Sequence, residues 1–358
     1  MYVRTRIVSR ATAFTAASAY FALPRTFATA AGPPTPRFVL LASGTNLGHP
    51  EKARSEDSFF TSTRAVGVAD GVGGWSSRGI DAGEYARELM SAASTACAAA
   101  ARAGEPLDAA SALSTAHAAV RLPGSATGLV AVAGDDGKLG VVNVGDSGLQ
   151  VWRRSASRLS SGSTVPLRVE EAAKLWECQH VVAMTTHGFN FPRQLAATAA
   201  YSDTVSDGAV ERVDVLAGDL IIAASDGVWD NLHAADIKAV LARFDFTPCV
   251  ALVRMARARK ATRAELLGDE PATPTKPRAL QALINVRAPE DVSDNAFADK
   301  RADCQAQLLA MSAAIAMASQ RVGKDPRARS PFAVASDGQF MGGKLDDATA
   351  VVALVVDE

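Results

Sequence analysis

Hydrophobic and polar residues alternate in blocks along the chain, and most of the apolar blocks predict strands. The run at 37–44 predicts an opening strand, and "SEDSFFTS" and "AVGVADGVGG" predict two short strands with a turn between them. Three later stretches, "ATGLVAVAG", "KLGVVNVGDSG" and "LQVWRR", predict consecutive strands, with "DDG" at 135–137 as a hairpin turn. The apolar runs at 219–227 and in the closing "DATAVVALVVD" predict two more strands.

Helical patterns separate the groups of strands. The segment 81–104 has good helix formers throughout and a glycine at its end. Further helices are predicted at 105–120, at 303–323 and in "HAADIKAVLARF". Because the helices join strands without strictly alternating with them, we expect layered antiparallel sheets with helices on the outside. From Phe38 onwards the chain shows no internal repeat and predicts one folded domain.

The composition of the first 50 residues predicts a separate segment at the N-terminus. They contain five arginines and many Ser, Thr and Ala residues, but no Asp or Glu. This composition predicts an organellar transit peptide over 1–36, in which "GPPTP" at 32–36 is the linker to the folded part at 37–358. A secretory signal is the weaker alternative, because hydroxyl residues interrupt its apolar core.

Charge and cysteine content exclude several classes of function. The formal net charge is −1, which gives no electrostatic case for binding nucleic acid. The four cysteines lie far apart without a C-x-x-C pair, which argues against zinc and disulfides and favours a reducing compartment. No run of about 18 apolar residues occurs, so we expect no integral membrane protein.

Five aspartates stand at the ends of predicted strands or in the turns beside them. They are Asp57, Asp70, Asp146, Asp226 and Asp346. An aspartate beside a glycine is common turn chemistry, so no single one indicates a site. Five carboxylates on strands that can neighbour one another would repel unless cations lay between them. Oxygen ligands without His or Cys favour Mg²⁺ or Mn²⁺.

The motifs around these aspartates resemble those of a known family. "EDSF", "ADGVGGW", "NVGDSG", "AASDGVWDN" and "GGKLDDAT" occur in the order found in the metal-dependent Ser/Thr protein phosphatases of type 2C. "DGVGGW", together with "FNFPRQL" at 189–195 and "SPFA" at 330–333, resembles the mitochondrial branch. The resemblance covers residues 38–356 and implies an α+β fold, a four-layer α-β-β-α sandwich with two central antiparallel sheets.

The resemblance also implies a catalytic centre. Asp57, Asp70, Asp226 and Asp346 would be the catalytic residues and would hold two Mg²⁺ or Mn²⁺ ions, with the carbonyl of Gly71 completing one shell. Asp146 matches the ligand of a weaker third ion. A hydroxide that bridges the two ions would attack phosphorus in line, and the ions would stabilise the attacking and leaving oxygens. A glycine beside Asp70 would let the backbone approach an ion.

The chain departs from the family pattern in three places. Many members have a histidine that serves as general acid where this chain has Val72, so a metal-bound water would protonate the leaving oxygen. The phosphate-binding arginine of many members has two candidate counterparts here, Lys52 and Arg54. The spacing between the last two motifs predicts an insertion at about 258–300, either a regulatory or docking segment or one without function.

Three other functions compete with a protein phosphatase. "GDSG" at 145–148 and His117 resemble parts of a serine protease with Ser147 as nucleophile, but the two residues are too close in sequence for that fold. We expect Ser147 to be a turn hydroxyl with a local hydrogen bond. A catalytically weak or inactive module that binds phosphoproteins, and an enzyme for small phosphomonoesters, stay open.

The expected protein is therefore a protein-serine/threonine phosphatase that acts on phosphoproteins and does not bind nucleic acid. We expect a monomer in the mitochondrial matrix, with the chloroplast as the alternative compartment.

Overall fold

The computed structural model describes residues 38–134, 136–155, 168–198, 200, 202–259 and 294–357. The predicted transit peptide at 1–36 lies outside the described residues. Most of the predicted insertion at 258–300 lies outside them too, while its two ends belong to helices. Both expectations therefore stay predictions.

The first of two five-stranded sheets contains both the first and the last strand of the described domain. Its order is β1 (Phe38–Leu47), β14 (Ala348–Asp357), β13 (Leu220–Ala224), β7 (Gly148–Arg154) and β8 (Trp176–Val181). All neighbouring strands are antiparallel. Strand β14 is buried along nine of its ten residues. Its run of Val, Leu and Ala fits a central strand that is covered on both faces.

The second sheet is also antiparallel and has five strands. Its order is β12 (Ala209–Asp214), β6 (Lys138–Val144), β5 (Gly128–Ala133), β3 (Ala65–Asp70) and β2 (Asp57–Thr61).

Two small ribbons lie beside these sheets. One pairs β4 (Ser125–Ala126) with β11 (Leu195–Ala196), and the other pairs β9 (Thr186–Gly188) with β10 (Phe191–Pro192).

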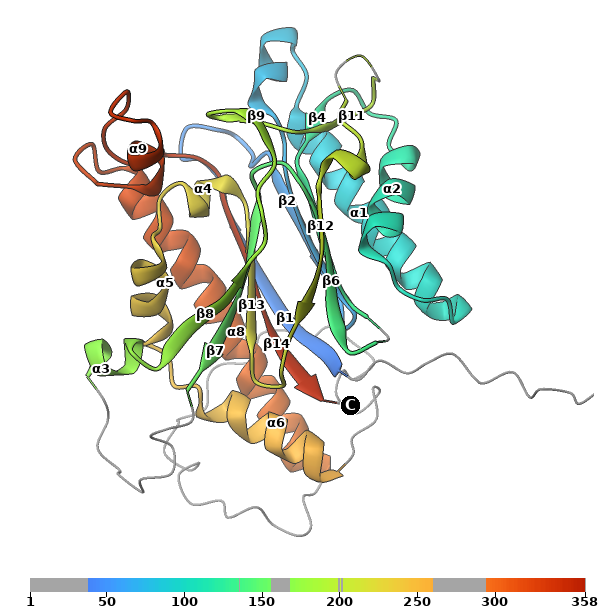
Figure 1. Cartoon of the computed structure of the whole chain (residues 1–358), viewed down its shortest axis with the longest axis vertical. Helices are drawn as coiled ribbons and strands as arrows, with labels where there is room; N and C mark the ends of the chain where they lie inside the picture. Colours follow the sequence, from blue (N-terminus) through green and yellow to red (C-terminus); the bar gives the residue numbers. More distant parts are fainter. Residues whose placement is uncertain are drawn as a thin grey trace, which may run out of the picture. The chain divides into compact units, whose positions relative to one another are not determined.

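Helices cover the outer face of each sheet (Figure 1). Helices α1 (Ala82–Ala103) and α2 (Ala109–Ala119) contact strands of the second sheet. Helices α6 (Thr247–Arg259) and α8 (Asp294–Gly323) contact the first. The shorter described helices are η1 (Gly73–Arg78), α3 (Val169–Ala173), η3 (Val205–Asp207), α4 (Asp226–Trp229), α5 (Ala234–Leu241) and α9 (Pro331–Ala335).

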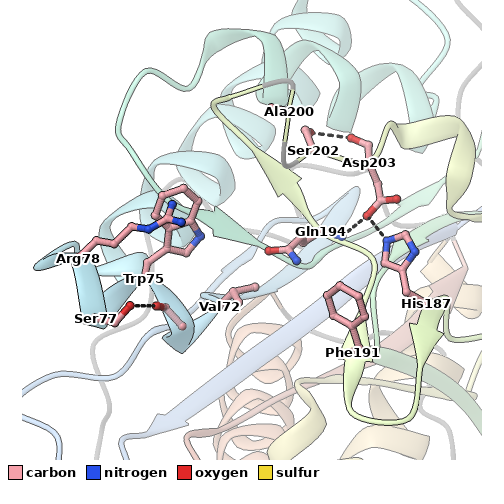
Figure 2. A pocket seen from close by; sticks show the side chains of 11 residues that line it. Val72, Trp75, Ser77, Arg78, His187, Phe191, Gln194, Ala200, Ser202 and Asp203 are labelled. Atoms are coloured by element: carbon pink, nitrogen blue, oxygen red, sulfur yellow. Dashed lines mark hydrogen bonds and ion pairs between the residues drawn. The ribbon is translucent and has the colours of Figure 1, made fainter.

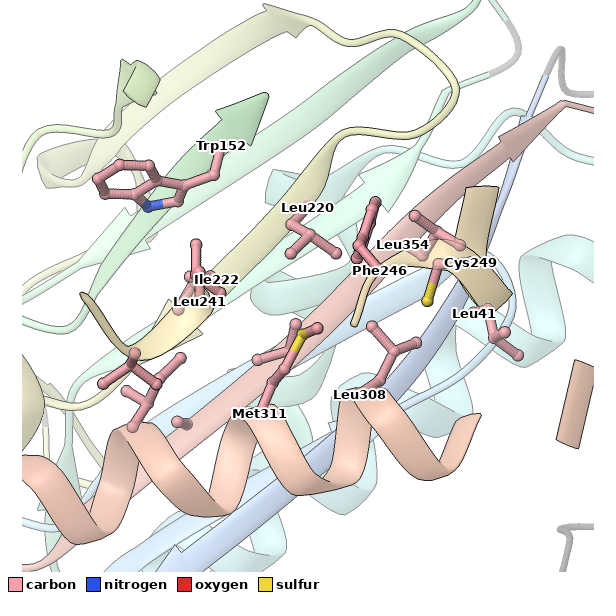
Figure 3. Close-up of a cluster of buried hydrophobic side chains, with 14 of the residues drawn as sticks. Leu41, Trp152, Leu220, Ile222, Leu241, Phe246, Cys249, Leu308, Met311 and Leu354 are labelled. Atoms are coloured by element: carbon pink, nitrogen blue, oxygen red, sulfur yellow. The ribbon is translucent and has the colours of Figure 1, made fainter. Parts of the chain in front are cut away.

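The buried side chains form three layers, which confirms the predicted four-layer sandwich. One layer lies between the two sheets and includes Leu40 and Val68. A second lies between the second sheet and the α1–α2 pair. The third, shown in Figure 3, packs Leu220 and Leu354 of the first sheet against Met311 of α8. Here two sulfur atoms also meet, those of Cys249 and Cys304, 2.6 Å apart.

Two helices differ from the prediction. Helix α8 begins at Asp294, nine residues before the predicted start at 303. Helix α6 was not predicted. Proline is tolerated in the first turn of a helix, and Pro248 is the second residue of α6. Within the described ranges, no helix has the length and apolar character needed to cross a bilayer.

Candidate metal centre

The antiparallel pairing of β2 with β3 brings the first two aspartates together. Asp57 is the first residue of β2, Asp70 is the last of β3, and the two are direct cross-strand partners. Side chains of such partners lie on the same face, and like charges there destabilise the pair. The predicted neighbours Asp57 and Asp70 therefore share one edge of the second sheet.

The first sheet supplies two more aspartates to the same place. Asp226 begins α4 directly after β13, and Asp346 lies two residues before β14. The hydroxyl of Ser225 donates to Asp57 Oδ2 at 2.7 Å and accepts from the backbone N–H of Thr349 at 3.0 Å. Ser225 thus joins the edges of the two sheets at the carboxylates.

Burial and mutual repulsion shift the titration of these acids. Burial raises the pKa of Asp57 to about 7 against the hydrogen bond from Ser225, and the charges of Asp347 and Asp226 add to it. Burial, followed by the charges of Asp57, Asp226 and Asp346, raises the pKa of Asp70 well above its usual range. Each acid favours its neutral form as long as no cation compensates its neighbours.

The turn between β6 and β7 brings Asp146 to the same group. Burial raises its pKa to about 7, and the charge of Asp226 adds to the rise. Gly145 has a φ of 113°, a conformation that glycine adopts without strain. The structure therefore gathers all five aspartates that the sequence singled out.

Lys344 supplies a positive charge inside this group. Its Nζ lies 2.5 Å from Asp226 Oδ2, 2.8 Å from Asp230 Oδ2 and 3.7 Å from Asp346 Oδ2. Burial works against ionisation of Asp226, but the Lys344 ammonium outweighs it and holds the pKa of that carboxyl below its usual value. Among the described residues, Asp226 therefore has the shortest ion pair of the five, while Asp346 has longer ones with Lys344 and Lys52.

Sequence reasoning missed Asp230 and Lys344. Asp230 follows Asp226 by four residues, a spacing that places two side chains on one face of a helix, so this signal was available. Burial and the charge of Asp226 raise the pKa of Asp230 to about 6. Lys344 gave no such signal, because a single lysine in a glycine-containing loop has no periodicity to interpret.

Two buried oxygens indicate that the donor set fits hard cations. Asp57 Oδ1 and Asp226 Oδ1 are buried without a hydrogen-bond partner among the described residues. Within the same residues, no three His, Cys, Asp or Glu side chains form a group that could hold a metal ion in the present arrangement. Carboxylates repel one another when no ion lies between them, and Lys344 compensates part of their charge. Carboxylate oxygens with unused lone pairs suit Mg²⁺ or Mn²⁺.

Glycine is required at position 71 for a structural reason that the sequence did not show. A Cβ atom there would lie 2.7 Å from the carbonyl of Ala82, at the start of α1. The glycine is required by close packing against this helix, and not only by the predicted approach of a backbone carbonyl to an ion. The ligand role of its oxygen stays a prediction.

The two candidate phosphate-binding cations lie in different surroundings. Lys52 Nζ is 2.6 Å from Glu56 Oε2, 2.9 Å from Asp347 Oδ2 and 3.6 Å from Asp346 Oδ1. Arg54 is exposed and makes no ion pair with any residue that the structure describes. Lys52 is therefore engaged by carboxylates, whereas the Arg54 guanidinium is available.

The protease interpretation has no support in the geometry. Ser147 is fully buried, and its hydroxyl shares a hydrogen bond of 2.8 Å with that of Thr127. His117 Nε2 lies 3.0 Å from the carbonyl of Ala196. The expected local hydrogen bond of Ser147 is wrong, because its partner is on the neighbouring strand segment and not in its own turn.

A pocket of about 510 Å³ opens beside Val72, two residues after Asp70. Figure 2 shows Trp75 and Arg78 at one end of it and His187 and Asp203 at the other. The pocket thus lies between η1, which begins three residues after Asp70, and the β9–β10 ribbon.

Curated relatives of the chain are named as phosphatases. Probable protein phosphatase 2C 80 of Arabidopsis thaliana is 32% identical over 323 residues, which cover 88% of this chain and 58% of that protein. Probable protein phosphatase 2C 55 of the same plant is 35% identical over 209 residues, 56% of this chain and 39% of that protein. The chain therefore spans less than two thirds of these relatives.

A solved structure shares the fold. The X-ray structure of the photosystem II phosphatase PBCP matches with a TM-score of 0.58 and 23% identity, over 88% of this chain and 98% of that one. No model of a known protein family matches the chain.

Proposed function

We propose, from the premise that this chain carries a domain of the type 2C protein phosphatase family, that the protein hydrolyses phosphoserine and phosphothreonine in proteins with the help of Mg²⁺ or Mn²⁺. The observation that carries the proposal is the meeting of Asp57, Asp70, Asp226 and Asp346 at one edge of both sheets. Two of these carboxylates have buried oxygens without a partner among the described residues.

Four carboxylates and one backbone oxygen would hold two ions. These are Asp57, Asp70, Asp226 and Asp346 with the carbonyl of Gly71, and Asp146 would serve a weaker third ion. When bound, the cations would supply Lewis-acid activation of water and neutralise charge on the phosphoryl oxygens. The hydrogen bond from Ser225 fixes Asp57, and the Lys344 ammonium keeps Asp226 ionised as long as no ion is bound.

The chain's own cations would bind the phosphoryl group. We assign the substrate phosphate to Arg54, because Lys52 is already held by Glu56 and Asp347. A guanidinium also presents paired N–H donors that match phosphate oxygens. The phosphoprotein substrates would be those of the mitochondrial matrix, or of the chloroplast as the alternative.

The first test uses the full chain and a phosphoserine peptide, with Mn²⁺ and with EDTA. We expect turnover in Mn²⁺, loss of it in EDTA, and a loss of more than about 10²-fold for Asp226→Asn, since the substitution removes a charged ligand. Asp214→Asn is the matched control, because the Asp214 side chain is 85% exposed and forms an ion pair only with Lys138 among the described residues.

Activity that survives chelation would refute the metal mechanism. A chain that binds Mn²⁺ and the phosphopeptide but turns over no substrate would instead be the inactive phosphoprotein-binding module. Turnover of small phosphomonoesters without any turnover of peptides would assign the activity to small substrates.

A further inference from the structure

The pocket beside Val72 contains a histidine held by a carboxylate. His187 Nε2 lies 2.9 Å from Asp203 Oδ2, and the His187 side chain is 36% exposed. The ring is packed by Phe191, with ring centroids 5.0 Å apart. Since Nε2 faces Asp203, the other nitrogen, Nδ1, is left for a ligand, and it has no hydrogen-bond partner among the residues that the structure describes.

Asp203 is itself fixed by several donors. Its Oδ2 also accepts the backbone N–H of Gln194 at 2.9 Å, and its Oδ1 accepts from Arg193 Nη1 at 2.8 Å. Burial works against ionisation, but these hydrogen bonds and the one from His187 lower the pKa of Asp203. A carboxylate that stays ionised orients an imidazole and stabilises its protonated form.

The segment that carries His187 is tied to the candidate metal centre. Thr185 makes two hydrogen bonds with Gly145, which precedes Asp146: its hydroxyl accepts from the Gly145 N–H at 2.9 Å, and its N–H donates to the Gly145 carbonyl at 2.8 Å. On the other side, Ser125 accepts from Trp75 Nε1 at 2.6 Å and donates to Gln194 Oε1 at 2.5 Å. Both ends of the pocket are therefore fixed relative to each other.

From this arrangement we infer that His187, oriented by Asp203, protonates the serine or threonine oxygen that leaves during hydrolysis. The inference rests on the proposed phosphatase function. It names a residue that can donate a proton to the leaving oxygen, which the apolar side chain of Val72 cannot do. His187 and Val72 line the same pocket, so a side chain that enters beside Val72 meets the imidazole. His187 is the proposed catalytic residue and Asp203 its positioning residue.

Hydrolysis replaces one bond between phosphorus and oxygen by another and transfers one proton to the leaving oxygen. The oxygen of a water molecule forms a bond to phosphorus, and the bond between phosphorus and the side-chain oxygen breaks. The electron pair of the broken bond goes to that oxygen, which takes the Nδ1 proton of the imidazolium. The proton lost by the attacking water passes to solvent, and solvent returns one to the imidazole. The products are inorganic phosphate and the free hydroxyl.

Several charged groups surround the imidazole. Asp203 is in contact, and Asp207 interacts with His187 electrostatically. Arg193 opposes them through its ion pair with Asp203, and Arg78 lines the same pocket. The carboxylate in contact has the shortest distance, so it has the strongest electrostatic interaction with the imidazole.

The test compares two substrates whose leaving groups differ in their need for a proton. Serine leaves as a strong base and needs one, whereas the phenolate of p-nitrophenyl phosphate does not. With Mn²⁺ and the full chain, His187→Gln should lower kcat on a phosphoserine peptide by about 10²-fold. The same variant should change kcat on the aryl phosphate less than about threefold, since the p-nitrophenolate leaves without a proton.

The pH profile separates proton donation from a structural role. Wild-type kcat on the peptide should fall on the alkaline side as the imidazolium is lost, and His187→Gln should lack this limb. Asp203→Asn removes the carboxylate that orients the ring, so it should lower kcat on the peptide and change kcat on the aryl phosphate less than about threefold. His180→Gln is the matched control, because His180 also contacts a carboxylate, Glu211, at 2.6 Å but does not line the pocket. It should leave both substrates and the profile unchanged.

Equal losses of His187→Gln on both substrates, or no loss on the peptide, would overturn the proton-donor role while the phosphatase function stands. A wild-type chain that hydrolyses neither substrate in Mn²⁺ would overturn the phosphatase function, and this inference with it.

Discussion

At the scale of single residues, Lys344 competes with the cations that the carboxylates are expected to bind. Its ammonium lies within 3.7 Å of three carboxylates and is 19% exposed. If the ammonium is removed from such a partly buried group, the carboxylates are left without a compensating charge. Lys344 should therefore contribute most to the stability of the folded protein when no metal is bound.

We expect Lys344→Met to lower the free energy of unfolding in EDTA by about 2 kcal/mol, since Asp226, Asp230 and Asp346 lose their shared cation. Saturating Mn²⁺ should narrow this difference, and calorimetric titration should show tighter Mn²⁺ binding than in the wild type. Urea unfolding with and without Mn²⁺ measures the stability. Lys138→Met is the control, since its partner Asp214 is 85% exposed. An equal loss with and without Mn²⁺ would contradict the competition.

The residues that the sequence predicted and those that it missed differ in the kind of signal. Asp57, Asp70, Asp146, Asp226 and Asp346 lie directly before or after apolar runs, so each could be placed at a strand end. Asp230 could have been found from its spacing to Asp226. His187 and Asp203 could not be paired, because the contact depends on how the β9–β10 ribbon folds back between them.

At the scale of elements, the start of α1 supports the metal centre from behind. Asp81 caps the helix by accepting the Gly83 N–H at 2.8 Å, and it also pairs with Arg87 at 2.9 Å. Arg87 in turn donates to the carbonyl of Ser55, two residues before Asp57. The first turn of α1 packs directly on Gly71. This cap should therefore affect metal binding as well as stability.

Asp81→Ala and Asp108→Ala form a matched pair, because Asp108 caps α2 in the same way by accepting the Ser111 N–H at 2.7 Å. Both should lower the free energy of unfolding by about 1 kcal/mol. Only Asp81→Ala should also weaken Mn²⁺ affinity, by about tenfold, since it loosens the support of Gly71 and Asp57. Urea unfolding and Mn²⁺ titration give the two values. Similar Mn²⁺ affinities in both variants would refute the support role of α1.

Elements were predicted well where the pattern was strong and poorly where tertiary contacts decide. Strand β14 and helix α1 have long, regular apolar patterns, and their predicted bounds agree with the structure. The first turns of α8 and the whole of α6 were missed, because charged residues in these segments obscure the apolar pattern that would predict a helix. Phe297 in the first turns of α8 is buried in the same core layer as Leu252 of α6.

At the scale of the whole domain, the carboxylates connect stability to pH and to metal. The acids with raised pKa values bind protons more tightly in the folded state than in the unfolded chain, where aspartate titrates at about 4. Their contribution is unfavourable above that pH, so stability falls as pH rises through about 7, the value of Asp57 and Asp146. Four aspartates have lowered pKa values and act in the opposite direction, against five whose pKa values are raised; the four are Asp136, Asp203, Asp207 and Asp226.

We therefore expect the protein in EDTA to be more stable at pH 5 than at pH 8, and Mn²⁺ to remove or reverse this order, because ions bind the deprotonated carboxylates. Urea unfolding at both pH values, with EDTA and with Mn²⁺, checks the prediction. Higher stability at pH 8 than at pH 5 in EDTA would show that the carboxylates do not repel as the structure indicates.

The direct pairing of Asp57 with Asp70 has a consequence for how the chain reaches its native state. Successive side chains of a strand point to opposite faces, so a slip of β2 by one residue would turn Asp57 away from Asp70. A misaligned first sheet would likewise separate Ser225 from Asp57. Divalent ions would thus bind only to molecules in which both sheets have paired in register. Because the ions would bind only this form, they would shift the folding equilibrium toward the correctly paired molecules and away from the misfolded ones.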